Sequence, residues 1–375
     1  MIKNKIVHFL ILIVILSSLD SIYISYTIGV KSSSEISILK YISTLLYFLF
    51  SSYLFYITLR KNKIPNKFIL DVLLIFYLTV IILVNLFYKN YTILYLIRVL
   101  SSMLIIFSAF NGFSGLIKPK YLKYFFFIHF IVQLIQAFLF NNLQGLSNLG
   151  LNLRNTGLLV MPSTAGLISV LSLIYFLANN KRNYFLIIVT IISVLLTASG
   201  LSLLILFISF FIIFNIKRSV FLILSGFLVP LFFIFAPIIL GRANLFESIS
   251  DRLYVWSKLI EKMQLLNLST SGYYTNSFAS AMRVSGNSSW RDFIIDGDFF
   301  MISLNFGVII FIIYIASILI KTISSNRNIF YLGIIFTCAS FTLNLLEIPF
   351  AILLFACLIT KYENKIPFNR NSTSS

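Results

Sequence analysis

The sequence has 375 residues, of which 59% are hydrophobic, 17% aromatic and only 11% charged. Soluble domains average about half apolar and about a quarter charged residues, so this composition excludes a soluble protein and indicates a polytopic membrane protein. The net charge is +18, but the cations lie mostly in short gaps between apolar runs, which is typical of membrane topology and not of nucleic-acid binding. The two cysteines lie in apolar runs and exclude a disulfide framework.

The apolar runs, taken in chain order, predict most of the helices. The run 6–28 follows two lysines and has no small-residue cleavage site, so we expect an uncleaved first helix and not a signal peptide. A span needs about 20 apolar residues. Single spans are expected at 6–28, 40–59, 68–88, 92–112, 121–140, 158–178, 219–240 and 298–320.

Two longer runs, 183–216 and 329–361, exceed the length of one ordinary span and carry cations at both ends. One helix would put those cations on opposite sides of the membrane, whereas a hairpin of two short helices puts them on the same side. Gly200 in "TASGLS" and Pro349 in "NLLEIP" are suitable breakers. We therefore predict two hairpins and an all-α bundle of about 12 transmembrane helices, forming one integral membrane domain over 1–375.

Charge fixes the expected orientation, with both termini cytoplasmic. Every short gap on the predicted inner side carries at least two cations, and the short outer gaps carry few, as the positive-inside rule requires. The inner cations are Lys3, Lys5, Arg60, Lys61, Lys63, Lys67, Lys118, Lys120, Lys123, Lys181, Arg182, Lys217, Arg218, Lys321, Arg327, Lys361, Lys365 and Arg370. Two longer segments then fall outside, 141–157 and the large extracytoplasmic loop 241–297.

The large loop contains the charged stretch "ISDRLYVWSKLIEKM". On a helical wheel its apolar residues, among them Leu253 and Trp256, lie on one side, and Asp251, Lys258 and Glu261 lie opposite. Such a helix lies flat on a membrane or caps the bundle, with its tryptophan at the interface. A purely structural interfacial helix is the alternative.

Arginines gather on this outer side, where a membrane chain usually avoids them. The guanidinium fork matches phosphate oxygens, so the pattern indicates a site for a phosphate-bearing ligand near the outer headgroups. The alternative is loop solubility with acidic partners. The candidates for binding pyrophosphate or glycan are Arg154, Arg242, Arg252, Lys258, Arg283 and Arg291.

Carboxylates follow at the end of the loop, in "DGDFF". Asp296 or Asp298 is a candidate base for a sugar hydroxyl, which glycosyl transfer would require. The alternative is that both cap the start of the next span. The DxD pattern also resembles a metal site, but it is common by chance, and we expect neither a metal nor a cofactor.

Polar residues also lie inside predicted spans. Arg98 lies about two turns from the outer end of its helix, can extend towards the headgroups, and is a further candidate ligand for substrate. His129, Gln133 and Gln136 fall on one helix face. Polar groups in hydrocarbon are costly and often line cavities, although this stripe can also simply pack inside the bundle.

Several short motifs resemble those of bacterial O-antigen and capsular polysaccharide polymerases (Wzy-type), which are relatives of the O-antigen ligases. "RNTGLLVMPSTAGL" is similar to an Arg-x-x-Gly then Pro-Asn/Ser pattern, here Arg154, Gly157, Pro162 and Ser163. "SDRLYVWSKLI" resembles the Arg-x-x-x-Trp opening of the large loop, and "DGDFFMISLNFGVIIFI" resembles its exit. Gly200 stands where the family usually has arginine, which weakens the likeness there.

The resemblance implies a GT-C-like glycosyltransferase in the bacterial cytoplasmic (inner) membrane. Its substrates would be oligosaccharide repeat units on undecaprenyl pyrophosphate, joined at the outer face to make O-antigen, capsule or exopolysaccharide. Arg252 with Asp296 or Asp298 would serve catalysis. Other assembly proteins, namely a flippase and a chain-length regulator, are the expected partners besides membrane lipid.

Two alternatives stay open at the sequence level. An O-antigen ligase is expected to carry a functional histidine in its large outer loop, and the only histidines here are His8 and His129, which favours the polymerase. A lipid-linked oligosaccharide flippase or other transporter would usually show two related halves, and no such halves are evident.

Overall fold

The computed structural model describes residues 13, 38–61, 69–87, 93–111, 119–139, 157–159, 162–179, 184–197, 199–224, 297–298, 302, 308–343 and 345–363. Within them it delimits eleven helices and no strand. In chain order these are α2 (Ile38–Lys61), α3 (Ile69–Phe87), α4 (Ile93–Phe110), α5 (Pro119–Leu139), α7 (Pro162–Asn179), α8 (Tyr184–Thr197), α9 (Gly200–Ile213), α14 (Val308–Ser324), α15 (Arg327–Thr342), the 3₁₀ turn η3 (Leu345–Glu347) and α16 (Pro349–Glu363).

Both predicted hairpins are confirmed as pairs of short helices. Gly200 is the first residue of α9, and Ser199 caps that helix by accepting the Ser202 N–H on its side chain. Pro349 is the first residue of α16. A backbone N–H at this position has no partner within the helix, so proline, which has no N–H, fits there without loss. The Asn326 side chain donates to the Tyr362 carbonyl, 2.8 Å away, so the start of α15 meets the end of α16.

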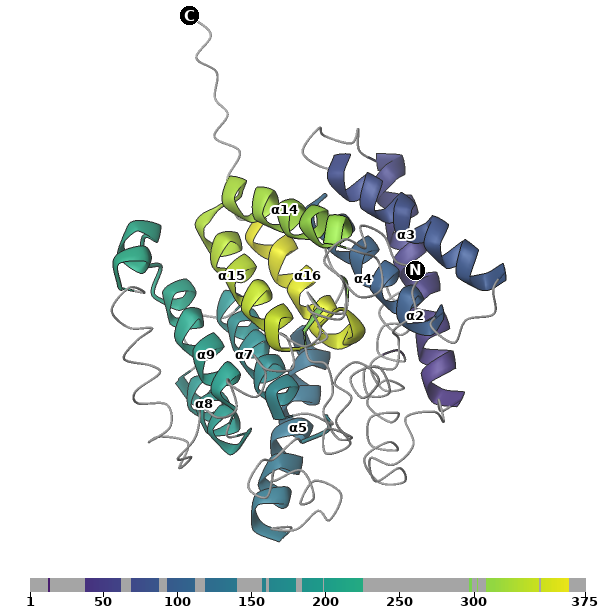
Figure 1. Cartoon of the computed structure of the whole chain (residues 1–375). Helices are drawn as coiled ribbons and strands as arrows, with labels where there is room; N and C mark the ends of the chain where they lie inside the picture. The colour runs from purple at the N-terminus through teal and green to yellow at the C-terminus, as the bar shows by residue number, and fades with distance from the viewer. Residues whose placement is uncertain are drawn as a thin grey trace, which may run out of the picture.

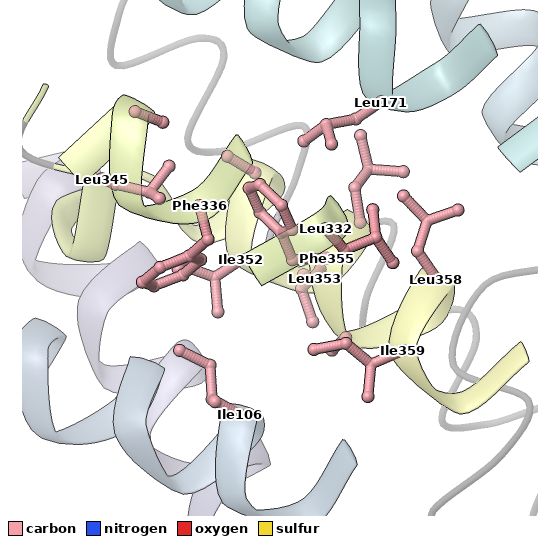
Figure 2. Close-up of a cluster of buried hydrophobic side chains, with 14 of the residues drawn as sticks. Ile106, Leu171, Leu332, Phe336, Leu345, Ile352, Leu353, Phe355, Leu358 and Ile359 are labelled. Atoms are coloured by element: carbon pink, nitrogen blue, oxygen red, sulfur yellow. The ribbon is translucent and has the colours of Figure 1, made fainter. Parts of the chain in front are cut away.

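The core is centred on α16. Its residues 349–360 are all buried, as expected for a helix that is apolar on every side. α16 packs against α4, α7 and α15, and Figure 2 shows Ile106, Leu171 and Phe336 from these three helices around Ile352 and Phe355. In Figure 1, α15 and α16 lie between α2–α4 on one side and α7–α9 on the other.

The outward faces of the bundle are apolar. Large hydrophobic side chains are exposed at helical spacing, for example Leu45, Leu49, Tyr53 and Tyr56 on α2, and α3, α5, α8 and α14 carry similar stripes. Water-exposed surfaces rarely carry apolar areas of this extent. Within the described residues one helix, Tyr41–Arg60, is by itself long and apolar enough to cross a membrane, so the count of about twelve spans stays a prediction.

Contacts between the helices define two ends of the bundle. At the cation end, Lys321 of α14 lies over the Phe110 ring at the close of α4, and Lys361 lies over the Tyr175 ring near the close of α7. The turn end carries the two hairpin turns, Ser199–Gly200 and Leu343–Ile348. The register of α2 and α4 is parallel, since Thr44 meets Arg98 and Phe55 meets Phe107.

Candidate active site at the turn end

Arg98 is the one candidate cation of the site that lies in the described residues. It sits five residues into α4 and is 7% exposed. Its Nε donates to Thr44 Oγ1 at 2.7 Å, and Nη2 donates to Ser43 Oγ at 3.3 Å, both on α2. It is therefore buried between two helices and does not extend along an exposed face. The two hydroxyls of α2 orient the guanidinium.

One helical turn deeper, a chain of hydrogen bonds crosses the bundle. The Tyr47 hydroxyl of α2 lies 3.0 Å from Ser102 Oγ of α4, and Ser102 donates to the Leu346 carbonyl of η3 at 2.6 Å. The Leu346 N–H donates in turn to the carboxylate of Asp298, at 3.1 and 3.3 Å from its two oxygens. Tyr47, Ser102 and Asp298 are fully buried.

Asp298 also uses its backbone, because its N–H donates to the Leu343 carbonyl at 3.1 Å. The residue before it, Gly297, has φ +118, and a Cβ there would lie 2.7 Å from the Phe341 carbonyl oxygen. Only glycine fits such a close approach at positive φ. The carboxylate therefore makes a tertiary contact with the turn at η3, which the interpretation as a helix cap did not include.

The polar stripe of α5, formed by His129, Gln133 and Gln136, packs against other segments of the chain. These contacts favour packing inside the bundle over the lining of a cavity. Gln136 forms a two-point contact with the Gly157 peptide, accepting its N–H at 2.7 Å and donating to its carbonyl at 3.3 Å. His129 Nδ1 accepts the Leu158 N–H at 3.1 Å. Gln133 accepts from Ser193 Oγ at 2.5 Å. Gly157, the glycine of the "RNTG" motif, therefore packs directly against α5.

Most of the predicted site lies outside the described residues, as does the amphipathic stretch around Trp256. The candidates concerned are Arg154, Arg242, Arg252, Lys258, Arg283, Arg291 and Asp296. The structure brings Arg98 and Asp298 into one hydrogen-bonded region through α4 and η3. Within the described residues no three His, Cys, Asp or Glu side chains come together as a metal site would require.

Sequence reasoning missed Tyr47 and Ser102. A signal for α2 was present, because Ser43, Thr44, Tyr47 and Ser51 recur at helical spacing in an otherwise apolar helix. Polar residues on one face of a span indicate contacts inside the bundle. Ser102 follows Arg98 by four residues and so shares its face.

The cation end carries a separate buried pair. The Lys321 ammonium forms an ion pair with Asp71 of α3, and Ser317 Oγ donates to the same carboxylate at 2.5 Å. Lys321, which the sequence assigns to the inner side, lies in the last turn of α14 and is only 3% exposed. Ser317, four residues earlier on α14, and Asp71 in the first turn of α3 complete this polar contact inside the bundle.

Comparisons with known proteins add no assignment to these contacts: no family model, no curated protein and no solved structure matches the chain.

Proposed function

We propose that the chain is a glycan polymerase of the bacterial cytoplasmic membrane. It joins oligosaccharide repeat units carried on undecaprenyl pyrophosphate, at the outer face. The growing glycan leaves its lipid pyrophosphate and is transferred to a hydroxyl of the next unit. Both termini are cytoplasmic, and the bundle is polytopic with the loop 241–297 on the outer side.

The observation that carries this proposal is the difference between the two ends of the bundle. Cations assigned by charge to the inner side, including Arg218, Lys321 and Arg327, lie at one end and contact neighbouring helices there. Arg98, Asp298 and both hairpin turns lie at the other. Because Asp298 directly follows the loop 241–297 in sequence, this arrangement favours an arginine-bearing loop at the turn end, facing outwards.

The chemistry follows from charge. As the acceptor oxygen attacks the anomeric carbon, the bond from that carbon to the pyrophosphate oxygen breaks, and negative charge grows on the leaving group. Fixed cations stabilise such charge best when they are oriented beforehand in a site of low dielectric. Arg98, held by Ser43 and Thr44, is suited to this role, and the loop arginines would complete the site. Asp296 is our candidate for accepting the hydroxyl proton.

The contacts at the cation end argue against a flippase, which must open that end in each cycle. Arg218 donates to the carbonyls of Ile323 and Ser325, at 3.3 and 2.5 Å. Arg327 donates to the backbone and side-chain oxygens of Asn215, at 2.7 and 2.8 Å. These reciprocal bonds tie the segment after α9, which carries Asn215 and Arg218, to the α14–α15 junction. Opening of this end would have to break them.

The test is deletion of the gene in its host, followed by analysis of surface glycan and lipid-linked intermediates. A polymerase predicts single repeat units in place of long chains, with lipid-linked units at the outer face. Long chains that accumulate on the lipid carrier would indicate a ligase instead. Units that accumulate only on the cytoplasmic face would indicate a flippase. Complementation with Arg98→Gln should restore less polymer than complementation with Ser101→Ala, a buried neighbour whose hydroxyl bonds only its own helix at the Ile97 carbonyl.

A further inference from the structure

The second hairpin turn stops well inside the bundle. Ser102 lies nine residues after the start of α4 at Ile93, and Tyr47 lies nine residues after the start of α2 at Ile38. At about 1.5 Å per residue, both are roughly 13 Å along their helices. Both belong to the hydrogen-bond chain that ends on Leu346 of η3. The turn therefore lies more than two helical turns below the ends of α2 and α4.

The lengths of the two hairpin helices support this position of the turn inside the bundle. α15 has 16 residues and α16 has 15, or roughly 24 and 22 Å at 1.5 Å per residue, whereas a bilayer core is about 30 Å thick. Starting from the cation end, neither helix reaches the level where α2 and α4 begin. The turn that joins them therefore lies inside the bundle, at the level of Ser102 and Tyr47.

Non-helical backbone at such depth must find its hydrogen bonds within the protein. The turn does so through few groups. Ser102 and Asp298 satisfy the Leu346 carbonyl and N–H, and the Leu343 carbonyl accepts the Asp298 N–H. Within the turn, the Ile348 N–H donates to the Leu345 carbonyl at 3.0 Å. The Leu346 peptide is thus held from both sides, by α4 and by the residue that follows the large loop.

We propose that Tyr47, Ser102 and Asp298 are positioning residues that hold this buried turn in register with Arg98. This inference rests on the proposed polymerase function. Ser102 shares its helix face with Arg98, and Tyr47 shares α2 with the hydroxyls that bind Arg98. Asp298 ends the loop that carries the other candidate arginines. The chain of bonds therefore fixes the loop exit relative to the Arg98 guanidinium.

The register sets the Arg98 guanidinium relative to the loop exit at Gly297 and Asp298. A shift of about 1 Å in a positioned group can cost about a hundredfold in rate, and sites built on rigid elements keep the tolerance that catalysis needs. A carboxylate that is fully buried and whose two oxygens face a backbone N–H is poorly placed to take a proton from a sugar. Asp298 acts through the turn, and not as the base.

The test compares Asp298→Asn with Asp298→Ala in vesicles supplied with lipid-linked repeat units. Asparagine keeps an oxygen that can accept the Leu346 N–H, and alanine does not. We expect Asp298→Asn to stay within about threefold of the wild type, since one neutral hydrogen bond replaces a charge-assisted one. Asp298→Ala should raise KM for the lipid-linked donor by about tenfold or more, because donor phosphate binding depends on the register.

A second experiment tests Ser102 and has a matched control at Ser101. Ser102→Ala removes the bond to the Leu346 carbonyl, whereas Ser101→Ala removes an equally buried hydroxyl that bonds within its own helix. Hydrogen exchange of residues 343–348, measured in detergent, should accelerate in Ser102→Ala, Tyr47→Phe and Asp298→Ala, but not in Ser101→Ala. This readout does not depend on activity.

The outcomes separate the two proposals. If Asp298→Asn is as inactive as Asp298→Ala while exchange of 343–348 is unchanged in both, Asp298 is a catalytic group and the positioning role is wrong. Equal exchange in Ser102→Ala and Ser101→Ala would also refute it. If the wild-type chain polymerises no lipid-linked unit, the polymerase proposal fails, and the exchange arm still decides whether the network holds the turn.

Discussion

The buried pair between Asp71 and Lys321 gives the sharpest stability prediction. Both side chains are almost fully buried, and Ser317 adds a hydrogen bond to the same carboxylate. Removing one partner leaves a charge buried without its counter-charge, which typically costs about 3–5 kcal/mol. Replacing both by apolar residues of similar volume is often neutral. We therefore expect Asp71→Leu and Lys321→Met each to destabilise strongly, and the double variant to recover most of the loss.

The size of the effect can be worked out for a thermal assay. An unfolding entropy of about 2.1 cal/mol/K per residue gives roughly 0.8 kcal/mol/K for 375 residues. A loss of about 3–5 kcal/mol then lowers Tm by about 4–6 °C. Ser317→Ala is the matched control, because it removes one neutral donor to the same carboxylate and should cost about 1.5–3 kcal/mol, less than the loss of the counter-charge.

The assay is thermal unfolding of the purified chain in detergent, with the wild type, the two single variants and the double variant arranged as a double-mutant cycle. The coupling energy should exceed about 3 kcal/mol, the upper end for ordinary contacts, because two single losses of about 3–5 kcal/mol each largely disappear in the double variant. Single variants that each shift Tm by no more than the Ser317→Ala control would refute the reasoning. Additive shifts in the double variant would do the same, since they would mean that the two charges do not interact.

Three further predictions concern packing and are measured by the same unfolding assay. Gly157→Ala should cost about 2–4 kcal/mol, because φ is +61 and the new Cβ would lie 2.4 Å from His129 Cε1; an unchanged Tm would contradict the seating of this glycine on α5. Gly166→Ala should cost about 1–3 kcal/mol, since its Cβ would lie 2.0 Å from Ser202 Oγ. Adding Ser202→Gly should restore most of that stability, and no recovery would show that the contact is not the cause. Arg327→Lys should cost about 1 kcal/mol because lysine cannot form the two-donor contact to Asn215, and a stability equal to the wild type would count against that contact.

The positions of most described helices were predictable because hydrophobicity and cation spacing act locally along the chain. The expected span 298–320 is an exception, since α14 covers Val308–Ser324, and the expected spans 6–28 and 219–240 lie largely outside the described residues. The hairpin prediction for 329–361 rested on cations at both ends and on Pro349, and α15, η3 and α16 follow it. The same argument placed the break in 183–216 at Gly200, the first residue of α9. In both cases the signal lies in residues close together in sequence.

The polar contacts inside the bundle, at the site and at the cation end, were not predictable in the same way. Ser102 and Leu346 are 244 residues apart, and Lys321 and Asp71 are 250 apart. A single sequence marks each of these residues as polar in an apolar setting but does not identify its partner. Asp298 shows the consequence, because its position before a span suggests a helix cap, whereas tertiary packing gives its carboxylate to the Leu346 N–H.

The placement of the loop 241–297 outside the cytoplasmic membrane is the central claim, and it can be tested in intact cells. Single cysteines would be introduced at Ser271 and at Lys217 in a background with Cys338 and Cys357 replaced, and labelled with a membrane-impermeant maleimide. The account predicts that Ser271→Cys is labelled in intact cells and that Lys217→Cys is labelled only after permeabilisation. Labelling of Lys217→Cys in intact cells, with Ser271→Cys protected until permeabilisation, would contradict the account.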